Sequence, residues 1–175
     1  FTLDCEVKLE DEFQPFLRPS AYVDYDRDSE CVRLAARLAE QEEDALGVVG
    51  AVFEYICDNI VYDTEKAQMV QTTSGYMPVL DDTLRTGKGI CFDYAALMAS
   101  MLRSQEVPCK LVVGYTGDVY HAWNNVWSEE DGWVRELLEG FNGASPKELA
   151  RQVMEESELR VGPADDRTVV VIGVR

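Results

Sequence analysis

The stretch Gly87-Lys88-Gly89-Ile90-Cys91-Phe92-Asp93-Tyr94-Ala95 decides how this chain folds. Its glycines permit a sharp turn, and the cysteine begins an apolar run with helical character over residues 91–103. That predicted helix is apolar around most of its circumference, which is typical of a helix buried at the centre of a domain.

Patterns on both sides of this central helix predict an α+β fold. Two helices are expected before it, over residues 29–38 (with Ser29 as the cap) and 44–59, and residues 62–89 are expected to form a long ordered loop. Three strands with short turns follow it, which predicts an antiparallel sheet packed on the central helix, with Trp123, Trp127 and Trp133 filling the core between them. The strands of this meander span residues 110–115, 119–127 and 133–137. Further elements are expected at both ends of the chain: a strand over 3–9, a helix over 145–158 and a strand over 168–174.

Length and composition narrow the class of protein. The 175 residues, 46% of them hydrophobic, suffice for one globular domain with a buried core. A formal net charge of −17 argues against nucleic acid or an anionic membrane as a partner, and no apolar run is long enough to span a bilayer. Four of the five cysteines (Cys5, Cys31, Cys57 and Cys109) fall at positions expected to be buried, which leaves Cys91 as the candidate for chemistry.

Cys91 and the only histidine, His121, lie thirty residues apart in the sequence. A thiol needs a base to become a good nucleophile, so this pair favours an enzyme of the cysteine-nucleophile type. A helix N-terminus and a neighbouring histidine favour the thiolate, and we therefore expect the pKa of Cys91 to lie below its ordinary value of about 8.5. The N–H of Cys91 would form one half of an oxyanion hole.

Four segments keep the order and spacing of a known family: Asn59-Ile60-Val61-Tyr62-Asp63, residues 87–97, residues 107–115 and Tyr120-His121-Ala122-Trp123-Asn124. With them, residues 55–134 resemble the bacterial transglutaminase-like domain, a branch of the papain-like thiol enzymes. The resemblance implies that Cys91 is the nucleophile and His121 the general base and acid. It also implies a peptide or protein substrate, an acyl-thioester released to water or to an amine, and no metal or organic cofactor. We expect Gly89, Tyr94 and Trp123 to bind the substrate.

The third catalytic residue of that family is missing. The family carries an aspartate on the strand after the histidine strand, and Leu137 occupies that position here. Glu136 and Glu139 are nearby carboxylates, and strand alternation puts Glu139 on the same face as residue 137. Glu139 is therefore the candidate substitute. The alternative is a catalytically impaired module that only binds protein or peptide.

The C-terminal part of the chain follows a different pattern. We expect a transglutaminase-like domain over residues 1–139 and a helix–strand appendage over 140–175, packed on the same domain. Residues 145–174 weakly resemble the C-terminal end of metal-dependent protein phosphatases of the type 2C class, on the motif Ala164-Asp165-Asp166-Arg167-Thr168. The other motifs of that class are absent, so no metal site is expected. The acidic composition and the missing initiator methionine favour a secreted or cell-surface location, while the oligomeric state stays open.

Overall fold

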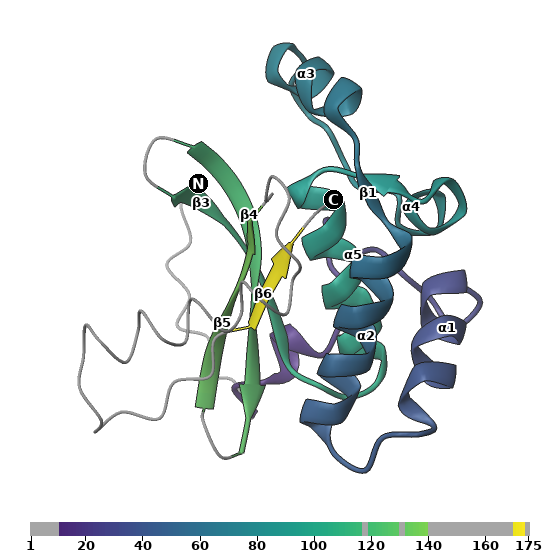
Figure 1. Ribbon diagram of the computed structural model, residues 1–175. Helices are drawn as coiled ribbons and strands as arrows, with labels where there is room; N and C mark the ends of the chain where they lie inside the picture. Colours follow the sequence, from purple (N-terminus) through teal and green to yellow (C-terminus); the bar gives the residue numbers. More distant parts are fainter. Residues whose placement is uncertain (1–10, 117–118, 130–131, 140–169, 174–175) are drawn as a thin grey trace, which may run out of the picture.

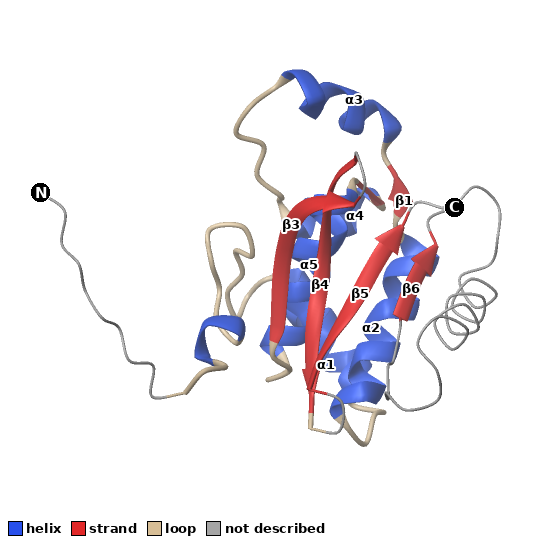
Figure 2. Ribbon diagram, turned by 90° about the vertical axis from the view of Figure 1, so that its left-hand side faces the viewer, coloured by secondary structure: helices blue, strands red, loops and turns tan. Residues whose placement is uncertain are grey.

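Helices cover one face of a four-stranded sheet in the computed structural model, which describes residues 11–116, 119–129, 132–139 and 170–173 (Figure 1). Figure 2 shows the sheet in front and the helices behind it. The elements in chain order are η1 (Gln14–Phe16), α1 (Glu30–Ala39), α2 (Ala45–Asn59), β1 (Val61–Tyr62), α3 (Thr64–Thr72), α4 (Leu80–Thr86), β2 (Lys88–Gly89), α5 (Cys91–Ser104), β3 (Cys109–Thr116), β4 (Val119–Ser128), β5 (Gly132–Glu139) and β6 (Val170–Gly173). This is the predicted α+β architecture.

The central helix α5 carries the core, as the sequence predicts. All of its residues from Asp93 to Arg103 are buried. They contact α1 and α2 on one side and β3 and β4 on the other (Figure 1). Each large apolar side chain removed from water in this way contributes about 1.5–3 kcal/mol. The position of α5, and therefore of its first residue, is fixed by contacts all around it.

The two helices before α5 are held at their first turns by carboxylates. Asp44 accepts the N–H of Gly47 at 2.7 Å and caps α2. At α1 the predicted cap is wrong, because the Ser29 side chain makes no capping bond there. Instead Asp81, from α4, accepts the N–H groups of Glu30 and Cys31 at 3.0 and 3.1 Å. A distant carboxylate thus ties α1 to α4.

The large sheet has the order β3-β4-β5-β6. The first three strands form the predicted antiparallel meander, with Val112 opposite Trp123 and Trp127 opposite Trp133. β6 pairs with β5 in parallel, with Leu137 opposite Val171. The division of the chain at residue 139 stays a prediction. The predicted strand over 3–9 and helix over 145–158 lie outside the described residues.

The prediction of a loop over residues 62–89 is wrong. Asp63 caps α3 by accepting the N–H of Lys66 at 2.9 Å, and α4 buries Leu80 and Thr83. β1 and β2 form a two-residue parallel pair. These elements are short, and α3 buries none of its residues. These helices have too few buried apolar residues for a helical periodicity to be recognised in the sequence, and turn-forming residues dominate the segment instead.

Trp127 and Trp133 lie on the opposite face of the sheet from the predicted one. Alternate residues of β4 are buried toward α5 (Ala122, Asn124 and Val126). Successive strand residues point to opposite faces, so Trp127, next to Val126, faces away from the helix. There the ring centroid of Trp127 lies 4.6 Å from that of Phe13, and that of Trp133 lies 5.1 Å from that of Phe16. The chain around η1, rather than α5, covers these rings.

Candidate active site

Cys91 is the first residue of α5, as predicted. The chain leaves α4 at Gly87, whose φ of 62° is the left-handed conformation that favours glycine. It then runs beside β1, where Val61 N–H donates to Gly87 O and Asp63 N–H donates to Gly89 O, both at 2.8 Å. The turn and this short pairing fix the direction in which the chain enters the helix and present the thiol at its N-terminus.

The thiol of Cys91 is half-buried. Burial, the largest effect, raises the pKa of Cys91, and the Asp93 carboxylate adds to the rise. Hydrogen bonding from the backbone of Ala122 and Phe92 lowers the pKa. The net shift is upward, so the expectation of a pKa below the ordinary value is wrong. The N-terminal N–H groups act in the expected direction, but the desolvation of the thiolate outweighs them.

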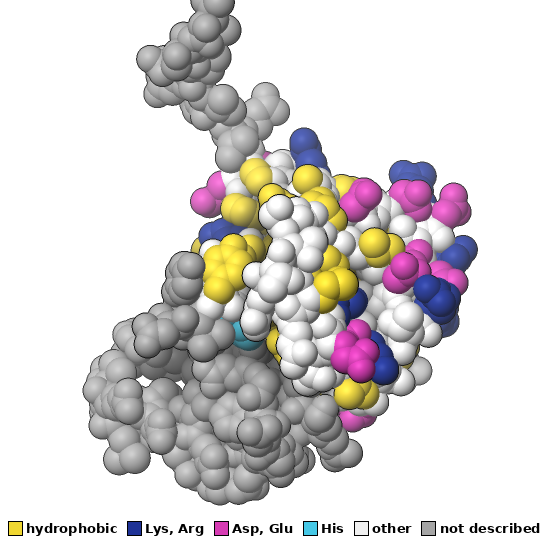
Figure 3. Space-filling model, turned by 90° about the horizontal axis from the view of Figure 1, so that it is seen from above, with side chains coloured by type: hydrophobic (Ala, Val, Ile, Leu, Met, Phe, Trp, Pro, Cys, Tyr) yellow, Lys and Arg dark blue, Asp and Glu magenta, His cyan; other side chains and the backbone are white. Residues whose placement is uncertain are grey.

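The backbone contact with Ala122 places the Cys91 sulfur beside the residue that follows His121 in β4. His121 is half-buried and lies opposite Gly114 of β3. A Cβ atom at Gly114 would lie 3.0 Å from the ring of Trp123, so this ring packs closely over the neighbouring strand. Figure 3 looks onto this end of the molecule and shows most of the visible acidic side chains on the side away from the histidine. The structure therefore brings the segment that carries His121 and Trp123 to the Cys91 end of α5.

Asp93 is fully buried and organises the first turn of α5. Its Oδ2 accepts the N–H of Ile90 at 2.8 Å and so stabilises the helix start. The same oxygen accepts from Lys66 Nζ at 3.0 Å, and Oδ1 accepts from the Tyr76 hydroxyl. The sequence singles out neither Lys66 nor Tyr76. The Asp63-Thr64-Glu65 capping pattern is a signal that would reveal the helix carrying Lys66, whereas nothing in the sequence marks Tyr76.

Two residues expected to bind substrate, Gly89 and Tyr94, are buried against other residues of the protein. Gly89 is buried, and a Cβ atom there would lie 2.8 Å from Asp93 Cβ. The close approach that this glycine permits is therefore made by Asp93. Tyr94 is 1% exposed, and its hydroxyl donates to Ile60 O at 2.9 Å. Tyr94 thus supports the helix from inside the core and presents no surface to a substrate.

The strand expected to hold the third catalytic residue continues through Glu139. Its pairing with β4 joins Asn124 to Glu136. The pairing of β4 with β5 ends at this pair, three residues before Glu139. At its end the strand pairs with β6, with Glu139 opposite Gly173. Glu139 therefore lies on the strand next to the one that carries His121.

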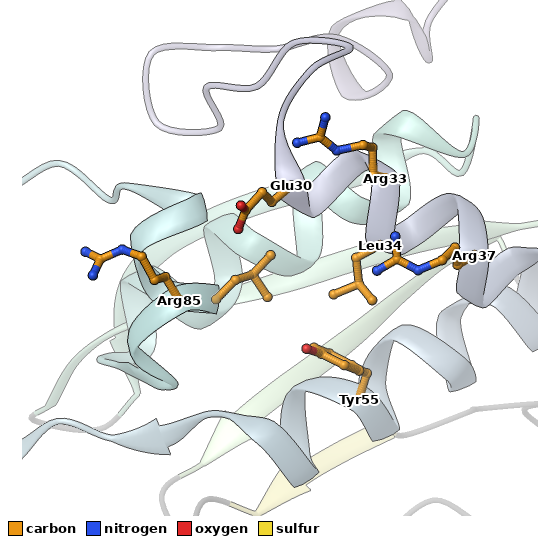
Figure 4. Close-up of a pocket in the computed structure, with 7 residues that line it drawn as sticks. Glu30, Arg33, Leu34, Arg37, Tyr55 and Arg85 are labelled. Atoms are coloured by element: carbon orange, nitrogen blue, oxygen red, sulfur yellow. The ribbon is translucent and has the colours of Figure 1, made fainter.

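A separate hollow lies between α1, α2 and α4 (Figure 4). It is lined by Glu30, Arg33, Leu34, Arg37, Tyr55, Leu84 and Arg85, and by none of the predicted site residues. Within the described ranges, no three histidine, cysteine or carboxylate side chains come together as a metal site would require. The chemistry-bearing groups therefore concentrate at the Cys91 end of α5.

Comparison with known families agrees with this fold. The family model of the transglutaminase-like superfamily matches residues 32–136. The match covers more than half of the chain and includes both Cys91 and His121. The chain belongs to the transglutaminase-like superfamily.

Particular relatives share only part of their length with it. Kyphoscoliosis peptidase of Mus musculus is 34% identical over 108 residues, which are 55% of this chain and 16% of that protein. Protein-glutamine gamma-glutamyltransferase of Pseudomonas aeruginosa is 34% identical over 70 residues, 31% of this chain and 10% of that protein. The crystal structure of the periplasmic domain of TgpA from Pseudomonas aeruginosa has the same fold, with a TM-score of 0.52 and 23% identity over 65% of this chain and 44% of that one. The chain thus spans about a sixth of the first of these relatives.

The comparisons give no support to the phosphatase resemblance of residues 145–174. Most of that segment lies outside the described residues, and β6 is the part of it that the structure describes. No helix in the described part of the chain has both the length and the apolar character needed to cross a bilayer.

Proposed function

We propose that the chain is a cysteine-dependent acyl-transfer enzyme that acts on carboxamide or peptide bonds of a peptide or protein. His121 takes the proton of the Cys91 thiol, and the sulfur bonds to the carbonyl carbon of the substrate. The carbon–nitrogen bond then breaks, and His121 returns the proton to the departing amine. Water or a second amine attacks the thioester, gives a proton to His121, and releases the acyl group from the sulfur. The thiol regains its proton from His121.

One observation carries this proposal. The only half-buried cysteine at a helix N-terminus in the described residues lies beside Ala122, next to the only histidine of the chain. N–H groups at a helix start can bind both a thiolate and the oxyanion of an attacked carbonyl. The raised pKa of Cys91 means that the thiol is mostly protonated at neutral pH, so a base is required. His121 is the proposed base, and Trp123 the proposed wall of the substrate site.

The proposal is tested with acid-quenched intact-mass spectrometry. The protein is incubated with a set of short glutamine-containing peptides, with and without hydroxylamine as an amine acceptor. We expect an acyl adduct on Cys91, which Cys91→Ala abolishes and Cys57→Ala, at another half-buried cysteine, leaves in place. Hydroxamate formation would identify transfer to an amine, and free carboxylate would identify hydrolysis. Equal product from wild type and Cys91→Ala would refute the proposal.

Glu139 is proposed as the third catalytic residue, which orients His121 and stabilises its charged form. Its place on β5, the strand next to the one that carries His121, and on the same face as residue 137 supports this role. We expect Glu139→Gln to lower the rate constant about a hundredfold or more, as loss of the carboxylate does in related triads. Glu136→Gln, at the position opposite Asn124, is the matched control and should keep nearly full activity. If the two variants are equally active, the site works without a third residue.

The second candidate function is a binding module without catalysis. Leu137, at the position of the family's aspartate, is the observation that favours it. Such a module would bind peptides equally well with Cys91→Ala and would form no thioester. Peptide binding measured by calorimetry on wild type and Cys91→Ala, together with the adduct experiment, separates the two functions.

We also propose a secreted or cell-surface location. The net charge of −17 suits exposure to solvent outside the cell, and a periplasmic domain of TgpA has the same fold. Residues 1–139 are proposed as the transglutaminase-like unit, with 140–175 appended through β6 on the β5 edge. Protease treatment of intact cells, with a cytoplasmic protein as the control, tests the location. Protection of the chain until the cells are lysed would contradict it.

A further inference from the structure

We propose that Lys66 and Tyr76 are positioning residues for Cys91, because they hold the arm formed by residues 63–79 against the first turn of α5 and balance the charge of Asp93 beside the nucleophile. This proposal rests on the proposed nucleophilic role of Cys91. It concerns how reactive the thiol is, and its test needs no substrate.

The carboxylate of Asp93 has partners on both oxygens, and most of them come from the arm. Its side chain is 0% exposed, and Lys66 Nζ lies 3.0 Å from Oδ2 with the lysine side chain 24% exposed. The Tyr76 hydroxyl donates to Oδ1, and the N–H of Ile90 donates to Oδ2. A buried carboxylate is costly unless it is paired and hydrogen-bonded. The arm therefore supplies the positive charge that pairs with the buried carboxyl group of Asp93.

The arm has little else to hold it in this place. Its helix α3 buries no residue and projects from the end of the molecule at which α5 begins (Figure 1). Lys66 Nζ lies 5.7 Å from the centroid of the Tyr76 ring, and that ring lies 6.5 Å from the ring of Phe92. Asp63 N–H, bonded to Gly89 O, fixes only the beginning of the arm. Lys66, Tyr76 and Asp93 thus form the principal contact between the arm and the nucleophile helix.

This contact acts on Cys91 through charge. Asp93 lies two residues after Cys91, and its negative charge opposes formation of the thiolate. The titratable or charged groups around this region are Asp93 on α5, Tyr62 on β1, and Asp63, Lys66 and Tyr76 on the arm, with His121 next to Ala122 on β4 and the exposed Lys88 on β2. Lys66 is the cation that pairs with Asp93. Removing it leaves the field of Asp93 uncompensated in a region of low dielectric constant, so the thiolate becomes less favourable.

Tyr76 contributes a hydrogen bond rather than a charge. Burial, followed by the hydrogen bond and the charge of Asp93, raises the pKa of Tyr76 well above its ordinary range. The Tyr76 hydroxyl therefore keeps its proton at neutral pH and donates a hydrogen bond to the Asp93 carboxylate. Loss of this hydroxyl should weaken the contact less than loss of the Lys66 charge.

The test is the pH dependence of Cys91 alkylation by a brief pulse of iodoacetamide, followed by peptide mass mapping. We expect Lys66→Met to raise the midpoint of the pH–rate curve and to slow alkylation at pH 7 by about tenfold, as loss of a close opposite charge does. Lys66→Arg should restore most of the rate, and Tyr76→Phe should shift the midpoint by less in the same direction. Lys88→Met is the matched control, because Lys88 is exposed and lies closer in sequence to Cys91 than Lys66 does.

A double variant shows whether the effect passes through Asp93. In an Asp93→Asn background the charge that Lys66 balances is gone, so Lys66→Met should no longer move the midpoint. An unchanged midpoint in Lys66→Met, or an equal shift in Lys88→Met, would overturn the proposal even if Asp93→Asn failed to fold. If the pH–rate curve of Cys91 alkylation is the same in every variant, the positioning role is refuted. If Cys91 also never forms an acyl adduct, the proposed function is refuted as well. If the midpoint shifts as expected without acyl transfer, the positioning role alone survives.

Discussion

Adding one methyl group at Gly89 tests how the nucleophile turn is packed. The new Cβ atom would lie 2.8 Å from Asp93 Cβ and 3.3 Å from Thr83 Cγ2, whereas carbon atoms normally approach to about 3.5–4.0 Å. Asp93 is held by its three hydrogen bonds, so it cannot retreat without breaking at least one of them. We expect Gly89→Ala to lower the free energy of unfolding by about 2 kcal/mol, within the range for overpacked sites.

Gly50→Ala is the matched control for this substitution. Gly50 lies in the exposed part of α2, and nothing is within 4 Å of the position of its Cβ atom. Alanine is a better helix former than glycine, so this variant should gain about 0.5–1 kcal/mol. Urea unfolding followed by circular dichroism gives both values, provided that the dependence on urea is the same in all three proteins. A Gly89→Ala protein as stable as the wild type would refute this account of the turn.

Two further predictions concern groups away from the thiol. Asp81→Ala should destabilise the protein by about 1–2 kcal/mol in urea unfolding, because it removes two capping hydrogen bonds from α1. The control Asp82→Ala breaks an exposed ion pair with Arg85 and should change the stability little. Equal losses of stability in the two variants would contradict the assigned cap. Burial raises the pKa of Cys31 from 9.0 to about 11, so the folded state holds this proton more tightly than the unfolded state. This contribution to stability is complete below pH 9 and is lost as the pH rises toward 11. Between these pH values the free energy of unfolding of the wild type should therefore fall by about 2 kcal/mol more than that of Cys31→Ala. Unfolding measured at each pH tests this. Parallel stability curves would exclude the effect.

The central helix and the meander could be predicted from the sequence because their signals are local. An apolar run after a glycine turn marks where α5 begins, and alternating residues with tight turns mark β3, β4 and β5. The family resemblance adds the identity of the two candidate catalytic residues. The start of α5 at Cys91 is confirmed to the residue.

The rest depends on contacts between segments distant in the sequence. Asp81 caps a helix that begins fifty-one residues earlier, and nothing around Glu30 announces this. α4 is stabilised by the burial of Leu80 and by its contacts with α1 and α5. Its own sequence shows no helical periodicity that would reveal it. The sign of the pKa shift at Cys91 could not be predicted either, because it depends on how much protein covers the thiol. A helix N-terminus favours the thiolate, but only the folded structure shows that the opposing effect of burial on the pKa of Cys91 is larger.

The two-residue pairing of β1 with β2 has a consequence for redesign. It brings residues 61–62 beside residues 88–89, so the chain between them, which holds the arm and α4, closes on itself beside the nucleophile. Lengthening such a closed segment is cheap, since doubling it costs only about 0.6 kcal/mol of loop entropy. Arms from other members of the superfamily could therefore be grafted between the two strands while α5 and the sheet are left intact. A chimera of this kind needs to keep a cation and a hydroxyl for Asp93.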